Sequence, residues 1–248
     1  MLGITGAPRR PEIDQYAIKL LIGAGAFSLP VIELALACLT GQSIDSISAS
    51  YLHDPWPRNI FVGFLFAIGA LMTTYNGDSE TQMWLAKLGA LAAFCLALFP
   101  CHCTDGKQEI VPYVHLIATI VMFAVLTAFC FIFSGKARDK LKKDKTHRQA
   151  KWRAYIYIGC ASAMVVSIAL FLVFVVANFL HARGLGAEAN HSILNGLVLV
   201  GETLGLLAFG IAWVTASRVL PGITRQTERN ELFGLRHSKN GDGPGSSA

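Results

Sequence analysis

The sequence predicts an all-α polytopic membrane protein whose six transmembrane helices form one bundle. The chain has 248 residues, of which 53% are hydrophobic and only 15% are charged, whereas roughly a quarter of an average soluble domain is charged. A membrane-spanning helix needs about 20 mostly apolar residues. We predict one transmembrane domain over residues 1–220 and a flexible cytoplasmic tail over residues 221–248. The six segments that meet or approach the spanning length are 17–39, 60–75, 84–100, 112–134, 154–180 and 193–217.

Lys and Arg are distributed unevenly along the chain, and this asymmetry predicts its orientation. The segment 135–153 carries nine of them, and others lie near the start of the first span and after the last span. The alternate connections hold only Arg58, Lys107 and Arg183. Because Lys and Arg collect in cytoplasmic loops, we expect both termini to be cytoplasmic.

The basic segment 135–153 raises the question of a nucleic-acid partner. Positive-inside bias and attraction to anionic lipid account for its charge. It lacks the interleaved aromatic side chains on which bases stack. We therefore expect membrane lipids, and another membrane protein as an alternative partner, but no nucleic acid.

The longest outward-facing connection, residues 40–59, is polar until it meets the second span. Pro55 and Pro57 stop a helix from extending backward and rigidify an irregular segment, and Trp56 favours the headgroup level. We expect the second span to begin after this junction. The loop itself should fold back over the bundle toward His115, at the start of the fourth span. Its candidate functional residues are Ser46, Ser48, His53 and Arg58.

Two carboxylates lie inside the predicted spans, where charge is costly. Glu33 is in the outer half of the first span, and Glu202 comes about ten residues into the sixth. A charge near the bilayer centre costs about 3 kcal/mol or more, so Glu202 should point into the bundle, protonated or hydrogen-bonded. At helical spacing it shares a face with Leu206, Phe209 and Trp213. Its role is either that of a proton, ion or catalytic site or that of a structural hydrogen-bonding group.

Small residues predict where helices approach closely. Gly201 and Gly205 form a small-xxx-small pair, so the backbone of another helix should come close beside Glu202. Gly23, Gly25 and Ala26 should play the same part in the first span. The donors that we expect for the Glu202 carboxyl on other helices are Ser28, Thr73 and Asn178.

Polar groups near the outer ends of the spans suggest a metal site as an alternative. Imidazoles and carboxylates are zinc ligands, and the candidates are His53, His115 and Asp54. No close ligand spacing such as HExxH is present, and histidines at an interface are more often solvated or hydrogen-bonded. We therefore expect no cofactor, with zinc as the alternative.

Two further motifs give only weak evidence for a functional or modification site. Cys101-His102-Cys103 lacks the CxxC redox spacing, and a disulfide across one residue is strained. Asn190-His191-Ser192 matches a glycosylation sequon on the predicted outer side.

Several segments together resemble a known group of proteins. These are Ser46-Ile47-Ser48-Ala49 with His53, the run 58–63, and Tyr75-Asn76-Gly77. The chain resembles an uncharacterised group of bacterial six-helix membrane proteins with a Ser-Ile-Ser-Ala…His loop after the first helix. That group resembles the wider DRAM/Frag-like superfamily, in which a serine-containing outward loop precedes span two. The further matching points are Leu29-Pro30, Phe99-Pro100, His115, Glu202 and the run 209–213.

The resemblance implies the fold and a bacterial inner-membrane location, but not one activity. Members of the superfamily take part in lipid-anchor remodelling or in autophagy and lysosome modulation, and fold does not carry function. Asp54 and Cys101 stand where small hydroxyl residues are expected. A second resemblance, to membrane hydrolases of the alkaline-ceramidase type, rests on Ser48 and His53, but span six lacks their HxxxH pair.

Three functions follow from these observations. The first is a non-enzymatic integral membrane protein that binds lipid or a membrane partner through its outer loop and helix grooves. The second is a membrane-embedded lipid hydrolase with an outer-leaflet site of histidines and carboxylates, with or without zinc. The third is a small proton-coupled transporter that uses Glu202.

Overall fold

The computed structural model describes residues 14–41, 43–52, 55–101, 110–143, 148–184 and 191–224. This part of the chain contains six α-helices and one short 3₁₀ helix, η1. Each α-helix is long and apolar enough to cross a membrane, which confirms the predicted six-helix transmembrane fold. The elements are α1 (Gln15–Thr40), η1 (Ser48–Leu52), α2 (Pro55–Thr74), α3 (Glu80–Leu98), α4 (Ile110–Lys143), α5 (Arg148–Ala182) and α6 (His191–Ala216).

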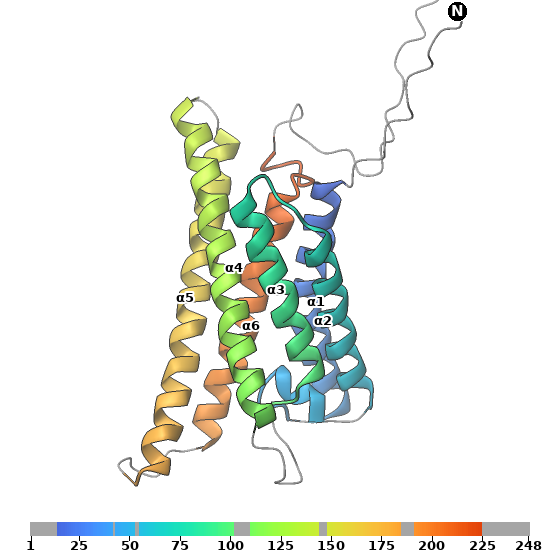
Figure 1. Ribbon diagram of the computed structural model, residues 1–248, viewed down its shortest axis with the longest axis vertical. Coiled ribbons are helices and arrows are strands. Elements are labelled where there is room, and N and C mark those ends of the chain that lie inside the picture. Colours follow the sequence, from blue (N-terminus) through green and yellow to red (C-terminus); the bar gives the residue numbers. More distant parts are fainter. Residues whose placement is uncertain are drawn as a thin grey trace, which may run out of the picture.

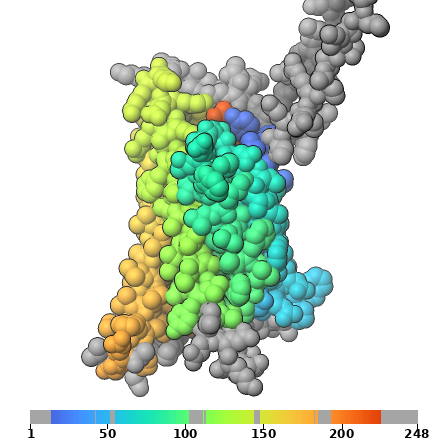
Figure 2. All heavy atoms as spheres, viewed as in Figure 1, coloured from blue at the N-terminus to red at the C-terminus, as the bar shows by residue number. Residues whose placement is uncertain are grey.

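The helices form a ring that follows the order of the chain. Each helix packs against the next, and α6 closes the ring by packing extensively against α1. A smaller contact joins α4 to α6 across the ring. Figure 1 shows the helices running roughly parallel to one axis, with η1 near the lower end. In the space-filling view, α4 and α3 occupy the centre of one face and α5 forms its left edge (Figure 2).

We expected the basic segment between the fourth and fifth spans to be a loop. Its described residues are instead largely helical. Helix α4 continues to Lys143, and α5 begins already at Arg148. Both helices rise above the rest of the bundle at the upper left of Figure 1. The segment after Gly135 is rich in good helix formers, and the lysines of the last turn of α4 interact favourably with its carbonyl end.

The second span begins earlier than predicted. Helix α2 starts at Pro55, so Pro55 and Pro57 both lie in its first turn. The first turn of a helix tolerates proline, because its N–H groups have no partner within the helix. The prolines therefore mark the helix start and do not form an irregular segment in front of it.

The turn after α2 is held by side chains from two other helices. Gly77 has φ +64°, which glycine adopts without steric cost. Gln15 of α1 accepts hydrogen bonds from the backbone N–H groups of Asn76 and Gly77, at 3.2 and 3.4 Å. Lys87 donates to the backbone carbonyl of Thr73 at the end of α2, so its ammonium group meets the negative end of the helix dipole.

The closest helix crossing joins α1 to α6 at two glycines. A Cβ atom at Gly23 would lie 2.6 Å from the backbone nitrogen of Val214, and one at Gly210 would lie 2.8 Å from the carbonyl oxygen of Gly23. The backbones of α1 and α6 are therefore in contact here. Gly23 was predicted to allow such an approach, and its partner glycine in α6 is Gly210. At Gly205 the close neighbour is the Phe123 side chain of α4, so the backbone approach that we expected beside Glu202 is wrong.

Replacing Gly23 by Ala should destabilise the bundle by about 1–3 kcal/mol, the usual cost of overpacking. The added methyl group would meet the α6 backbone, which moves only if the two helices separate. Gly196→Ala is the matched control in α6, because nothing lies within 4 Å of that position. Thermal unfolding of the detergent-purified protein measures both variants. Equal melting temperatures would contradict the tight crossing.

Candidate functional site

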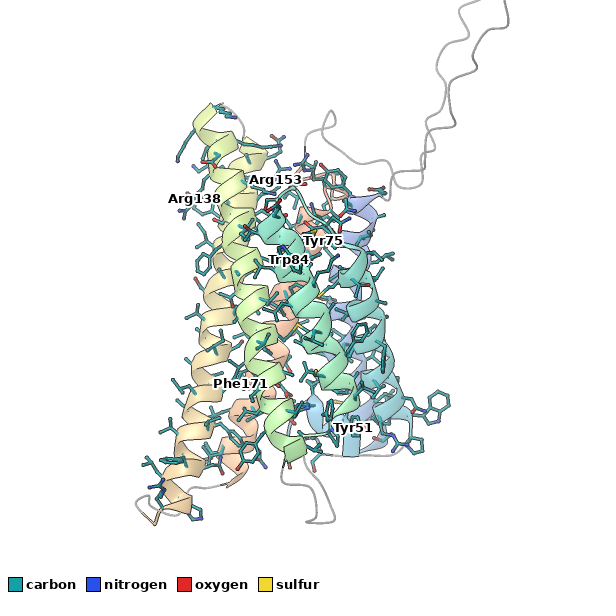
Figure 3. The ribbon with its side chains drawn as sticks, viewed as in Figure 1. Tyr51, Tyr75, Trp84, Arg138, Arg153 and Phe171 are labelled. Atoms are coloured by element: carbon teal, nitrogen blue, oxygen red, sulfur yellow. The ribbon has the colours of Figure 1, made fainter. Side chains whose placement is uncertain are left out.

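A short segment between α1 and α2 reaches into the bundle, and we call it the serine loop (residues 45–52). Ile47 is 1% exposed and Ser50 is completely buried. Tyr51 marks this loop near the lower end of the bundle in Figure 3. Non-helical backbone at membrane depth is tolerated only where protein groups satisfy its N–H and C=O groups, so the partners of this loop decide whether it can sit there.

Glu202 of α6 supplies the main partner. Its Oε1 accepts a hydrogen bond of 2.6 Å from the Ser48 hydroxyl, and its Oε2 accepts one of 3.1 Å from the Ser48 backbone N–H. Glu202 lies eleven residues after His191, the first residue of α6, or about 17 Å along the helix axis. The carboxyl thus points into the bundle and caps the first residue of η1.

Glu33 of α1 holds the same loop from another side. Its Oε2 accepts a 2.9 Å hydrogen bond from the Ser50 hydroxyl, and its side chain is 2% exposed. Its Oε1 is buried with no hydrogen-bond partner among the described residues. Within the loop, the Ser46 and Ser48 hydroxyl oxygens lie 3.3 Å apart, and the Ser46 oxygen accepts from the Ala49 N–H at 2.9 Å.

The expected donors to Glu202 are therefore wrong. Asn178 donates to the Phe174 carbonyl of its own helix at 2.8 Å, and Thr73 donates to Ala70 at 2.6 Å. Ser28 makes no hydrogen bond to Glu202. The partner is a loop hydroxyl and a loop N–H, because a loop can adapt its position to the carboxyl whereas a distant helix cannot.

A cavity of about 50 Å³ lies directly beneath the serine loop. Ser48, His115, Thr119 and Glu202 contribute its polar wall. The rest is apolar and comes from Ile47 of the serine loop and from five helices, α1, α2, α3, α4 and α6. The volume exceeds the roughly 10–15 Å³ needed to hold one water molecule.

His115 of α4, which also lines the cavity, is oriented by a backbone carbonyl group. Its Nδ1 lies 2.7 Å from the carbonyl oxygen of Phe99, and because a carbonyl oxygen only accepts, Nδ1 carries a proton in this contact. Cys101, two residues after Phe99, has its sulfur 3.7 Å from the Ser48 carbonyl oxygen, so Cys101 and the serine loop are neighbours.

The structure brings together some of the candidate residues but not all. Ser48, His115 and Glu202 line one cavity, with Ser46 and Glu33 adjoining through the serine loop. Arg58 is exposed on the first turns of α2, so the expectation that it packs near His115 is wrong: the early helix start turns it outward. Asp45 is also exposed. The candidates His53, Asp54, His102, Cys103 and Asn190 lie outside the described residues.

The described residues hold no group of three or more His, Cys, Asp or Glu side chains placed to bind a metal ion. Two of the three proposed zinc ligands, His53 and Asp54, lie outside that part of the chain. The zinc site therefore stays a prediction from the sequence.

Sequence reasoning missed Ser50 and Thr119. Ser50 is the third serine at alternate positions, after Ser46 and Ser48, and this spacing was a signal that the whole run contacts the bundle. Thr119 lies one turn after His115 in α4, and its hydroxyl donates to the His115 carbonyl at 2.9 Å. The i, i+4 spacing places both residues on one helix face.

Comparison of the chain with protein families, with curated proteins and with solved structures found no match.

Replacing Glu202 by Leu should lower stability by about 1–2 kcal/mol, because two loop donors lose their acceptor. Glu202→Gln keeps one carbonyl oxygen and should cost less. The Ser48→Ala and Glu202→Leu effects should not add in the double variant, because the residues share one contact. Ser167→Ala is the control, since that hydroxyl bonds only to Ala163 of its own helix, at 3.0 Å. Strictly additive shifts in melting temperature would refute the contact as a stabilising interaction.

Proposed function

We propose that this protein binds the acyl chain of a membrane lipid or other amphiphile in the cavity beneath the serine loop. The single observation that carries the proposal is the distribution of polarity along the cavity. Its polar residues lie next to the loop, and its walls become apolar with increasing depth in the bundle.

The order of the lining residues along each helix shows this change from polar to apolar walls. Helix α4 runs away from the loop, and its contributions change from His115 and Thr119 to Met122 and Leu126. Leu126 lies eleven residues after His115, or about 17 Å along the helix. On α6, Glu202 at the loop is followed by deeper apolar residues. A narrow amphiphile with one polar end matches this arrangement, since small-molecule sites combine apolar walls with a few placed polar groups.

The cavity is small, and its lining supports adaptation to a chain. Met122 is unbranched at its end and fills space flexibly. Leu206 and Thr119 are only partly buried, so their side chains can shift to make room for a chain. A bound acyl chain would place its carbonyl or hydroxyl group at the polar wall.

Filling the cavity should remove the bound amphiphile. Ala26 is fully buried in the apolar wall, and Ala26→Leu would place three more carbon atoms in the cavity. Native mass spectrometry of the protein from mild detergent should show a lipid-sized adduct that is lost in this variant. Val166→Leu, at a 49% exposed position on α5, should retain it. Absence of any adduct from the wild-type protein, or its retention in Ala26→Leu, would count against the proposal.

A lipid hydrolase is the second candidate, because a serine, a histidine and a carboxylate line the same cavity. Ser48 would be the nucleophile and His115 the base. In the present arrangement the Ser48 hydroxyl donates to Glu202, which suits a structural role better. Release of fatty acid from a lipid that is abolished in both Ser48→Ala and His115→Gln would favour the hydrolase over the binding protein.

We propose further that both termini face the cytoplasm and that the membrane is a bacterial inner membrane. The Lys and Arg asymmetry supports this orientation, since the basic ends of α4 and α5 lie at the end of the bundle opposite the serine loop (Figure 1).

Cysteine labelling tests this orientation. Ser79 and Asp45 are both exposed and lie at opposite ends of the bundle. In a cysteine-free background, Ser79→Cys should resist a membrane-impermeant thiol reagent in intact cells, whereas Asp45→Cys should react. The reverse pattern would invert the orientation.

A further inference from the structure

The end of the bundle opposite the serine loop contains a buried cation in an aromatic cage. Lys19 of α1 is 5% exposed, so it lies inside the helix ring. Its ammonium nitrogen lies 5.1 Å from the ring centre of Tyr16, 5.5 Å from that of Tyr75 and 5.8 Å from that of Phe133. Figure 3 places Tyr75 near this upper end of the molecule.

Arg218 brings a second cation to the same ring. Its guanidinium carbon lies 5.0 Å from the Tyr16 ring centre, so both cations lie about 5 Å from one aromatic side chain. Arg218 follows α6 directly and has φ +57°, the only positive φ of a non-glycine residue in the described chain. This left-handed conformation turns the chain at the end of α6 and is uncommon for arginine.

The neighbouring acid does not neutralise these cations. Asp78 forms an ion pair with Lys136 of α4. Burial alone would raise the pKa of Asp78, but the Lys136 hydrogen bond and the charges of Lys19, Lys136 and Arg218 outweigh it, so the pKa is lowered. Asp78 is thus ionised and already paired. Within the described residues, neither Lys19 nor Arg218 forms a salt bridge.

A buried ammonium group is unfavourable when its neighbouring carboxylate is already paired elsewhere, because cation–π contacts offset only part of its lost hydration. Among the described residues, the charges of Lys19, Lys136 and Arg218 all act on the Asp78 carboxyl, so the positive charges around this acid outnumber it. Lys19 lies in the second turn of α1, close to the N-terminal end of that helix. Lys supplies a compact charge and Arg a planar set of donors, a combination that suits a phosphate group.

We propose that Lys19 and Arg218 form a binding site for a phosphate group, carried either by an anionic lipid or by a small soluble phosphate. The site lies at the opposite end of the bundle from the cavity and does not rest on the function proposed for that cavity. Basic pockets between transmembrane helices bind anionic headgroups in this way.

The test measures melting temperature during titration of the detergent-purified full chain. The ligands are dioctanoyl phosphatidic acid, inorganic phosphate and zwitterionic dioctanoyl phosphatidylcholine. Phosphatidic acid should stabilise the wild-type protein, and its apparent affinity should fall at least about tenfold in Arg218→Asn, the loss expected when one charge-assisted hydrogen bond is removed. Asparagine tolerates the positive φ of this position, so this variant removes charge without backbone strain.

Two further variants complete the design. Lys19→Met should weaken binding similarly, and Arg218→Asn carries the test alone if Lys19→Met does not fold. Lys142→Gln is the control, because that lysine is exposed, with 80% of its side-chain surface accessible, and it should leave the affinity unchanged.

The outcomes separate the two sources of phosphate. Stabilisation by phosphatidic acid alone identifies a lipid headgroup, and equal stabilisation by inorganic phosphate identifies a soluble ligand; both support the site. Three results overturn it: no stabilisation by either anion, equal stabilisation by phosphatidylcholine, or affinity that is unchanged in Arg218→Asn.

Discussion

The contact between Glu202 and Ser48 is the interaction on which the loop end of the bundle depends. A carboxylate this deep in a transmembrane helix needs donors, and a non-helical segment at the same depth needs acceptors for its N–H groups. The 2.6 and 3.1 Å hydrogen bonds meet both needs at once. Glu33 repeats the arrangement at Ser50 from the α1 side. Two helices that pack against each other, α1 and α6, therefore hold one short loop between them.

The position of this loop determines the shape of the cavity below it. Because Ile47 and Ser48 form part of the cavity wall, displacing the loop would open the cavity to the loop end of the bundle. The groups that fix the loop are also those that a polar ligand group would meet. Structural and binding roles thus fall on the same side chains, which is why the proposed experiments pair variants of the carboxyl with variants of the apolar wall.

Helix α6 connects this region with the cationic end of the molecule. It carries Glu202 beside the loop, crosses α1 at Gly210, and places the fully buried Trp213 among the aromatic side chains of the core. Arg218 follows its last turn and contacts Tyr16. Buried carboxylates thus lie at one end of the bundle, and buried or partly buried cations lie at the other. The close Gly23–Gly210 crossing keeps α1 and α6 in register between the two ends.

The sequence alone determined the six transmembrane helices, because length and apolar composition are local properties of the chain. It also determined that Glu202 points inward together with Phe209 and Trp213, since helical periodicity and the cost of charge in lipid require it. Only the tertiary structure decided the partner of Glu202, the outward position of Arg58, the pairing of Gly23 with Gly210 and the burial of Lys19. Apart from the position of Arg58, which follows from the start of α2 at Pro55, each of these joins segments far apart in the chain. The register between two helices depends on the packing of all their side chains and on no local pattern.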